Sequence, residues 1–236
     1  MIALDSYEIL SFDCYGTLID WESGILSALA PLLSRHGRSV PEETLLKAFG
    51  ELESVAEQPP YRPYSIVLRE VTEGLGRRFG FTPNAEERGS LARSLASWPP
   101  FPDTRDSLRA LKSKYRLAII SNIDDDLFAG TNQALGIEFD WIVTARQVGS
   151  YKPSLENFRQ ALARFGAPKD KVLHVAQSLF HDIAPAKSLG LSAVWVNRRQ
   201  GRPGPGAAPP ASARPDLEVP DLQRLADLAG VTRRSR

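Results

Sequence analysis

Short apolar runs separate longer amphipathic segments along this chain. Four or five mostly apolar residues in succession occur at 9–12, 117–120, 141–144, 172–176 and 193–197. Runs of this length are typical of strands that are buried on both faces of a sheet. Apolar residues at helical spacing predict helices between them, at about 104–114 and 154–165. Strands that alternate with helices in this way predict an α/β fold with a Rossmann-like parallel sheet.

A long helical block interrupts the alternation after the first strand. No strand pattern occurs between residues 20 and 98, and helices are expected there at about 22–36, from 41, at 61–79 and at 84–97. The Pro-rich stretch 98–102 marks the return to the sheet. We therefore expect a core domain formed by residues 1–20 and 99–236, with a helical cap domain of residues 21–98 inserted into it.

The last part of the chain predicts smaller elements. An edge strand is expected at 216–219 and a closing helix at 222–228. Between the last long strand and this edge strand, residues 201–210 are rich in Gly and Pro. We expect this stretch to be a mobile loop, because it has too few apolar residues to pack.

A carboxylate follows the first strand directly. Asp13 comes after the apolar run 9–12, and the pair Gly16 and Thr17 then breaks the strand. In open α/β sheets, ligands bind in the crevice beyond the carboxyl ends of the strands. The alternative role for Asp13 is that of an ordinary turn residue. Its position favours a function in catalysis.

Other polar residues follow the later strands in the same way. Ser121 and Asn122 follow the second strand, Lys152 follows the third, and Asp182 lies shortly after the fourth. Each also has an ordinary structural interpretation, because Ser and Asn often cap helices and most lysines are solvated surface charges. Their common placement after buried strands predicts that they share one site with Asp13.

These segments resemble the four motifs of the haloacid dehalogenase (HAD) superfamily. The string from Phe12 to Leu18 is similar to the first motif, and the resemblance extends to about residue 199. It implies that Asp13 is a nucleophile that forms an ester, which water then cleaves. It also assigns the remaining positions. Thr17, Ser121, Asn122 and Lys152 would position Asp13 or bind an anionic group of the substrate, and Asp182 would orient Lys152 or the water.

Two departures from the HAD phosphatases point to chemistry at carbon. The phosphatases carry a second Asp two places after the nucleophile, where this chain has Tyr15, and a magnesium-binding Asp after the fourth strand, where it has Gln177. The haloacid dehalogenases share the aromatic residue and need no metal. We therefore expect no cofactor, with Mg²⁺ required only under the alternative of a phosphatase.

The sequence leaves two leaving groups as alternatives, a halide and an amine. The dehalogenase cap carries a halide-binding Arg, whereas residues 46–53 of this chain offer only Lys47. Leu179 and Phe158 replace an Asn and a Tyr of those enzymes. The strings at 13–22, 121–124 and 178–182 also resemble a dehalogenase relative that opens azetidine-2-carboxylate, in which nitrogen leaves. In that case His181 is the expected proton donor, and otherwise it is a loop residue.

Four further side chains are expected around the substrate. Tyr15, Trp21 and Phe180 are candidates for an apolar wall, although buried aromatic residues more often serve packing. Ser178 belongs to the fourth motif and is expected to contact the substrate. The three consecutive acids at 124–126 fit the start of a helix better than a metal site.

Composition limits the classes of molecule that the protein is expected to bind. The net charge of +1, from 29 basic and 28 acidic residues, gives no electrostatic footprint for nucleic acid or an anionic membrane. Cys14 is the single cysteine, so no intrachain disulfide forms, and no motif supplies a base for a thiol catalyst. The N-terminal residues lack the pattern of a signal peptide, and no apolar run is long enough for a membrane helix. A cytoplasmic protein is expected, and a homodimer is left open.

The sequence thus predicts a hydrolase of a small 2-substituted carboxylic acid that acts through an aspartyl ester. The substrate would be a 2-haloacid or azetidine-2-carboxylate. The alternatives are a magnesium-dependent HAD phosphatase and a binding protein that keeps the fold without catalysis.

Overall fold

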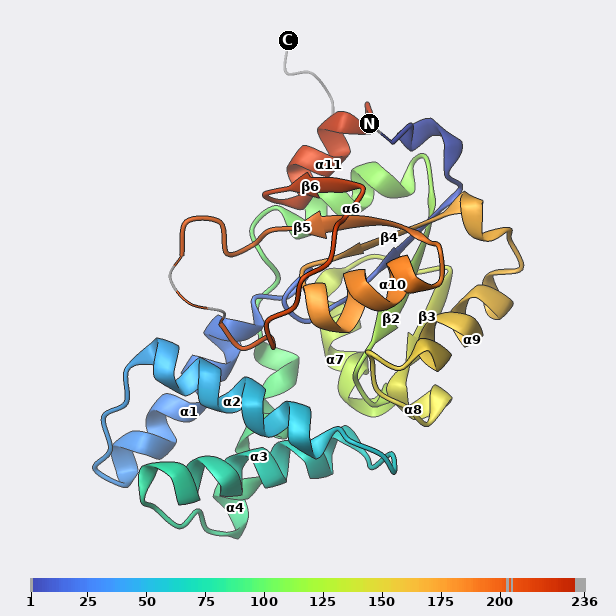
Figure 1. The fold of residues 1–236 in the computed structure, drawn as a ribbon. Coiled ribbons are helices and arrows are strands. Elements are labelled where there is room, and N and C mark those ends of the chain that lie inside the picture. Colours follow the sequence, from blue (N-terminus) through green and yellow to red (C-terminus); the bar gives the residue numbers. More distant parts are fainter. Residues whose placement is uncertain (1, 203, 205, 232–236) are drawn as a thin grey trace.

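The computed structural model describes residues 2–202, 204 and 206–231. Within these residues, six strands form one sheet in the order β3-β2-β1-β4-β5-β6, and all neighbours are parallel. The strands are β1 (Ile9–Phe12), β2 (Arg116–Ser121), β3 (Trp141–Thr144), β4 (Val172–Ala176), β5 (Ser192–Val196) and β6 (Leu217–Val219). Every expected strand is present, and the predicted α/β fold is confirmed (Figure 1).

Helices cover both faces of the sheet. Side chains alternate between the faces along each strand, so Leu10 and Ile9 of β1 belong to different apolar clusters. The cluster of Leu10 includes side chains of α6 (Thr104–Lys112), α7 (Asp125–Leu135) and α11 (Leu222–Leu228). The cluster of Ile9 includes side chains of α9 (Leu155–Phe165) and α10 (Ala184–Ser188). Burial from both sides explains why β1 is apolar rather than alternating.

The strand register aligns the ends of the central strands. Phe12, the last residue of β1, lies opposite Ile119 of β2 and Val175 of β4. Because all three strands run in the same direction, the residues that follow them meet at one edge of the sheet. The shorter elements are η1 (Leu4–Ser6), α8 (Ala145–Val148), η3 (Lys169–Lys171) and η4 (Leu179–Ile183), the last being a single π-helical turn after β4.

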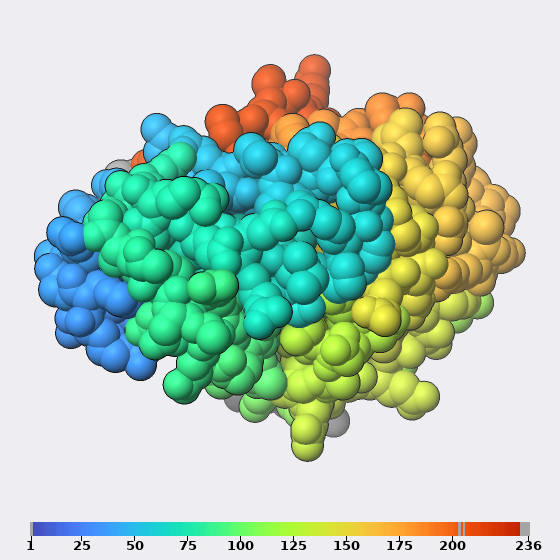
Figure 2. Space-filling view, turned by 90° about the horizontal axis from the view of Figure 1, so that it is seen from below, coloured from blue at the N-terminus to red at the C-terminus, as the bar shows by residue number. Residues whose placement is uncertain are grey.

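Five of the helices between β1 and β2 form a layer beyond this edge, and we call them the cap helices. They are α1 (Trp21–Arg35), α2 (Glu42–Ala56), α3 (Tyr64–Phe79), α4 (Ala85–Arg88) and α5 (Ser90–Ser94), followed by the short η2 (Leu95–Ser97). They cover one end of the molecule in Figures 1 and 2. The two chain crossings to the core lie side by side, since Asp20 N donates to Pro99 O at 2.8 Å. The predicted division of the chain into domains at residues 21 and 98 stays a prediction.

One expected cap helix is broken. The apolar pattern at 84–97 predicts a single helix, but the structure has α4, α5 and η2 in its place. Asn84 and Glu87 form a capping box at the start of α4, and Gly89 ends that helix. A Gly at this point removes the side chain that would favour a continuous helix.

The Gly- and Pro-rich stretch packs against the cap, and the expectation that it would not pack is wrong for part of it. We call residues 206–210 the strap. Ala207 is 0% exposed, and its backbone N–H donates to Glu22 of α1 at 3.2 Å. A Cβ on Gly50 of α2 would lie only 1.9 Å from the Ala207 carbonyl oxygen. Backbone packs here on a glycine, so few apolar side chains are needed.

Candidate active site

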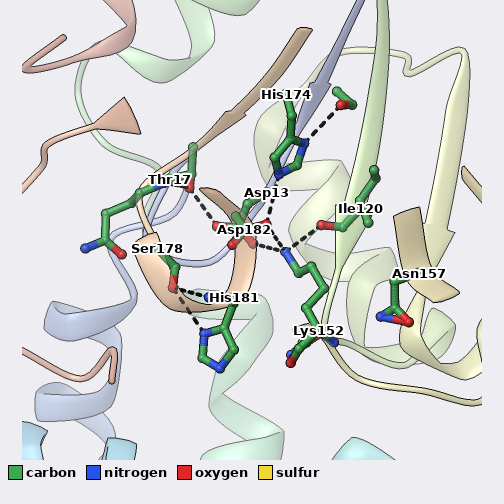
Figure 3. Close-up of polar contacts among 12 residues, drawn as sticks. Asp13, Thr17, Ile120, Lys152, Asn157, His174, Ser178, His181 and Asp182 are labelled. Carbon is green, nitrogen blue, oxygen red and sulfur yellow. Dashed lines mark hydrogen bonds and ion pairs between the residues drawn. The ribbon is translucent and has the colours of Figure 1, made fainter. Parts of the chain in front are cut away.

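One lysine connects two carboxylates at the carboxyl edge of the sheet. Lys152 Nζ donates to Asp13 Oδ1 at 2.9 Å, to Asp182 Oδ1 at 2.6 Å and to the Ile120 carbonyl oxygen at 2.9 Å (Figure 3). The side chain of Lys152 is 1% exposed. An ammonium group has three donors, so these contacts use all of them. The structure therefore brings together the three residues predicted to be catalytic.

The second oxygen of Asp13 is also held. Thr17 Oγ1 donates to Asp13 Oδ2 at 2.6 Å and accepts a hydrogen bond from the Gln177 backbone N–H at 2.8 Å. Gly16 allows this turn, because its φ of +94° lies in the region that favours glycine. Each carboxylate oxygen of Asp13 thus accepts one hydrogen bond, and the group keeps a fixed orientation at the end of β1.

Burial and neighbouring charges have opposite effects on the pKa values of Asp13, Asp182 and Lys152. Burial raises the pKa of Asp13, and the charge of Lys152 and the Thr17 hydrogen bond oppose this rise. Burial also disfavours ionisation of Asp182, but Lys152 and His174 outweigh it and hold its pKa below the usual value. For Lys152, burial is outweighed by the two carboxylates, which raise its pKa. Lys152 is therefore a permanent cation, and Asp182 is a permanent anion at neutral pH.

A buried histidine that the sequence analysis did not select supports Asp182. His174 Nε2 lies 3.0 Å from Asp182 Oδ1, and its Nδ1 lies 3.0 Å from Ser11 Oγ. Since an ionised carboxylate only accepts hydrogen bonds, Nε2 carries a proton and donates to Asp182. Ser11 and His174 are register partners on β1 and β4. In the sequence, Ser11 and His174 are each a polar residue inside an apolar run, and this pattern could have indicated that they interact.

Asn122 holds the backbone of the lysine. Its Oδ1 accepts from Lys152 N at 2.7 Å, and its Nδ2 donates to Lys152 O at 3.0 Å. The same Nδ2 lies 3.3 Å from both carboxyl oxygens of Glu57. Ser121 Oγ, in contrast, is buried and has no hydrogen-bond partner in the part of the chain that the structure describes. Ser121 thus offers a free polar atom to a ligand.

A small cavity of about 40 Å³ opens onto Asp13. Core and cap both contribute to its wall. The lining residues are Asp13, Tyr15, Trp21, Glu53, Glu57, Tyr64, Ser121, Asn122, Lys152, Gln177, Ser178, His181, Asp182 and Ala208. The cavity therefore suits a small substrate that is held between core and cap.

The predicted aromatic residues differ in their placement. Tyr15 and Trp21 line this cavity, and the Tyr15 hydroxyl is engaged with Thr131 Oγ1 at 2.7 Å. Phe180 lies outside it and lines a neighbouring cavity with Tyr61. Phe180, His181 and Asp182 all belong to the π-helical turn η4. His181 and Asp182 line this cavity, whereas Phe180 does not.

Ser178 and His181 form a pair at the start of η4. Ser178 Oγ accepts from the His181 backbone N–H at 3.0 Å and lies 3.2 Å from His181 Nδ1. Burial lowers the pKa of His181 to about 4, although the charge of Asp182 opposes this shift. The imidazole is therefore neutral at pH 7 and has no readily donated proton. This finding does not favour the predicted role of His181 as a proton donor.

The cap adds three polar residues that the sequence analysis missed. Glu53, Glu57 and Tyr64 line the cavity from the cap side. An i, i+4 pair of glutamates on an amphipathic helix has the pattern of a solvated face, so nothing in the sequence marked this pair as buried. Lys47, the substitute for the halide-binding Arg, does not line the cavity, and its side chain is 65% exposed.

The structure offers no cluster for a metal ion within the described residues. No group of three or more His, Cys, Asp or Glu side chains there has a suitable arrangement. None of the helices in residues 2–202, 204 and 206–231 is long and apolar enough to cross a lipid bilayer.

The sheet, the cap helices and the lysine-held Asp13 together define an α/β enzyme with a buried carboxylate in its site. The chain belongs to the haloacid dehalogenase-like hydrolase family, whose model matches residues 7–190. The predicted membership in the HAD superfamily and the predicted hydrolase class are confirmed.

Individual relatives agree with this assignment. An (S)-2-haloacid dehalogenase of Pseudomonas fluorescens is 26% identical over 196 residues, which are 80% of this chain and 84% of that protein. A glyceraldehyde 3-phosphate phosphatase of Methanothermobacter thermautotrophicus is 40% identical over 101 residues, 42% of this chain and 45% of that protein. The crystal structure of the L-2-haloacid dehalogenase PA0810 covers 96% of this chain and 100% of its own, with a TM-score of 0.78 and 24% identity. The last similarity establishes the fold.

Proposed function

We propose that the protein hydrolyses the bond between C2 and its substituent in a small 2-substituted carboxylic acid, through an ester on Asp13. One observation carries the proposal. Both carboxylate oxygens of Asp13 are fixed, by Lys152 and Thr17, at the wall of the cavity between core and cap. A positioned carboxylate in such a site is suited to nucleophilic attack. Similarity to the (S)-2-haloacid dehalogenase over most of both chains supports a substrate of this size and class.

The first step forms the ester. One oxygen of Asp13 bonds to C2 of the substrate, and the bond from C2 to its substituent breaks with the electron pair going to the substituent. Ser121 Oγ has no protein partner within the described residues and is available to the substrate carboxylate. Burial raises the pKa of Asp13, and the Lys152 ammonium opposes this rise and favours the ionised, nucleophilic form.

The second step releases the product. Water attacks the carbonyl carbon of the Asp13 ester, the C2 oxygen leaves with one proton of the water as a hydroxyl group, the other proton passes to solvent, and Asp13 regains its carboxylate. Negative charge develops on the Asp13 carbonyl oxygen in this step. Lys152 is the nearby cation that stabilises it, and Asp182 together with His174 keeps Lys152 in place.

Isotope incorporation tests the ester directly. In a single turnover in H₂¹⁸O, the label should enter the Asp13 carboxyl group and the product should remain unlabelled, as measured by mass spectrometry of both. Label that passes straight into product would exclude the ester. Asp13→Asn should remove nearly all activity, because a neutral amide is a poor nucleophile.

A substrate panel tests the reaction class. The panel contains 2-chloropropionate, azetidine-2-carboxylate and p-nitrophenyl phosphate, each with EDTA and with Mg²⁺. Turnover of either carboxylic acid with EDTA supports the proposal. Turnover of the phosphate alone, and only with Mg²⁺, would support the phosphatase alternative that the partial similarity to a phosphatase keeps open.

A further inference from the structure

A second cavity adjoins the one at Asp13, and we call it the side cavity. It has a volume of about 250 Å³, against about 40 Å³ for the cavity at Asp13. Three residues, Glu57, Lys152 and His181, line both cavities, so the two spaces have a common wall. The other residues that line the side cavity are Ser54, Gln58, Pro59, Tyr61, Gly149, Ser150, Tyr151, Pro153, Ser154 and Phe180.

The cavity at Asp13 has room for little more than the reacting part of a substrate. A cavity needs about 10–15 Å³ to hold one water, so a volume of about 40 Å³ suits about three groups of that size. The carboxylate, C2 and the leaving group fill such a space. A longer chain on C2 therefore has to continue into another cavity, and the side cavity shares with this one the lysine that holds Asp13.

The common wall contains two side chains that are not bonded to each other. Glu57 Oε2 and His181 Nε2 are 4.0 Å apart, which is longer than a hydrogen bond. Burial raises the pKa of Glu57 and lowers the pKa of His181 to about 4, and both shifts favour the uncharged form. A substrate chain that separates these two groups thus breaks neither a hydrogen bond nor an ion pair between them.

The side cavity is rich in aromatic surface. Tyr61 and Tyr151 line it with their ring centroids 5.1 Å apart, and Phe180 lines it as well. The Tyr61 hydroxyl donates to Asp124 Oδ1 at 2.7 Å, and the Tyr151 hydroxyl donates to the Arg62 carbonyl oxygen at 2.7 Å. Because both hydroxyl groups are engaged with the protein, these tyrosines offer their rings to a ligand. Aromatic rings bury a large apolar area and pack well against other rings.

The side cavity offers little charge to an ionic group. Apart from the tyrosine hydroxyls, its ionisable groups among the described residues are those of Glu57, Lys152 and His181. The Lys152 ammonium uses all three of its donors on acceptors of the core. Glu57 and His181 favour their uncharged forms, as stated above. An ion placed here would lack an available partner, so the side cavity suits an uncharged group.

We propose that the side cavity is a subsite for an uncharged aromatic ring that the substrate carries on C3. This inference rests on the proposed function, because it places C2 of the acid at Asp13. The substrate class is a 3-aryl propionic acid with a leaving group on C2, and its product is the 3-aryl-2-hydroxy acid. The carboxylate and C2 remain in the cavity at Asp13, and the ring lies among Tyr61, Tyr151 and Phe180.

The subsite accounts for the position of Phe180. The sequence predicts this residue to be part of an apolar wall around the substrate, yet it does not line the cavity at Asp13. It lines the side cavity instead, next to His181 of the common wall, with the two ring centroids 4.9 Å apart. Phe180 therefore keeps its predicted contact with the substrate, at a more distant part of the molecule.

The binding of two products tests the subsite independently of the leaving group, because hydrolysis at C2 gives the same 2-hydroxy acid from any of them. The wild type is titrated by calorimetry with 3-phenyllactate and with lactate. We expect 3-phenyllactate to bind more tightly by roughly tenfold or more, the effect of burying one aromatic ring. Equal or weaker binding of 3-phenyllactate would overturn the inference.

Three variants locate this preference. Ser54→Trp places a large side chain in the side cavity from α2, and Phe180→Ala removes one of its rings. The matched control is Val55→Trp, since Val55 lies on the same helix, is 73% exposed and lines neither cavity. The ratio of the Kd for lactate to the Kd for 3-phenyllactate should fall to about 1 in Ser54→Trp, fall less in Phe180→Ala and stay unchanged in Val55→Trp. A ratio that neither Ser54→Trp nor Phe180→Ala lowers, or that Val55→Trp lowers equally, would contradict the subsite.

Kinetics with 2-chloro-3-phenylpropionate and 2-chloropropionate complete the test. The ratio of their kcat/KM values should favour the phenyl compound in the wild type and lose this preference in Ser54→Trp. The two proposals fail separately. Turnover that places ¹⁸O in Asp13 without a preference for 3-phenyllactate would uphold the ester and overturn the subsite. A preference for 3-phenyllactate that Ser54→Trp removes, with ¹⁸O passing straight into product, would uphold the subsite and overturn the ester.

Discussion

Two hydrogen bonds join the side-chain amide of Asn122 to the backbone of Lys152, with Lys152 N donating to Oδ1 at 2.7 Å and Nδ2 donating to Lys152 O at 3.0 Å. This pairing replaces the backbone partners that a strand or helix would provide. It fixes the loop after α8, and with it the only cation that contacts Asp13 among the described residues.

Asn122→Ala should therefore affect stability and rate together. The variant leaves a buried N–H and a buried carbonyl oxygen without partners, which costs about 1–3 kcal/mol. We expect the free energy of unfolding, measured by urea titration, to fall by this amount and kcat to fall with it. A variant with reduced kcat and unchanged stability would show that Asn122 acts on the substrate alone.

Glu53 should make the protein less stable as the pH rises. Its native pKa of about 7 exceeds the ordinary value of 4.5, so the native state binds the proton more tightly than the unfolded state. The resulting stabilisation is fully present below pH 4.5 and is lost as the pH rises through 7, by about 3 kcal/mol in total. Glu53→Gln should flatten this part of the profile of unfolding free energy against pH. A profile with the same slope in wild type and variant would contradict the burial of an ionisable group here.

Activity on the true substrate should not depend on a metal. Lys152 Nζ occupies the position between Asp13 and Asp182, and its charge repels a cation. Gln177 lines the cavity where the phosphatases carry a further carboxylate. We expect full activity in excess EDTA and only trace hydrolysis of p-nitrophenyl phosphate with Mg²⁺. Activity that EDTA abolishes and Mg²⁺ restores would overturn the assignment to chemistry at carbon.

Gly50→Ala should detach the strap from α2. The new Cβ would lie 1.9 Å from the Ala207 carbonyl oxygen, and backbone there must move. Because Ala208 lines the cavity, we expect a higher KM together with a lower melting temperature. Gly74→Ala is the matched control, since the nearest atoms to its Cβ belong to the Leu52 side chain rather than to backbone. Equal effects of the two substitutions would show that the strap has no special part.

The sequence predicted the sheet and half of the cavity for a physical reason. Buried parallel strands have an apolar signature, and their ends meet at one edge, so the pattern alone predicts that Asp13, Asn122 and Lys152 lie together. The same logic does not extend to the cap. A helical pattern gives the period of a helix but not the surface that it faces, which is why Glu53 and Glu57 had the pattern of solvated residues.

The strap and the histidine were missed for other reasons. Close packing of backbone on Gly50 leaves no apolar signature, because the contact involves no side chain at either partner. His174 sits in an apolar run, and its partners appear only in the folded sheet, where the register of β1 and β4 places Ser11 beside it and the turn after β4 brings Asp182 to it. Register depends on the folded sheet rather than on local sequence.

The strap changes the mechanics of the cap. The two chain crossings at Asp20 and Pro99 lie side by side and would by themselves act as one hinge line, about which the cap could swing. Arg199 of the core holds Glu22 of α1 and Glu43 of α2, and the strap is seated beside it. The cap is thus joined to the core at points beyond the two crossings, which also include the hydrogen bonds of Tyr61 to Asp124 and of Tyr151 to the Arg62 carbonyl oxygen. If the cap opens for substrate exchange, these contacts must break, so we expect the exchange rate to depend on groups that take no part in the chemistry at carbon.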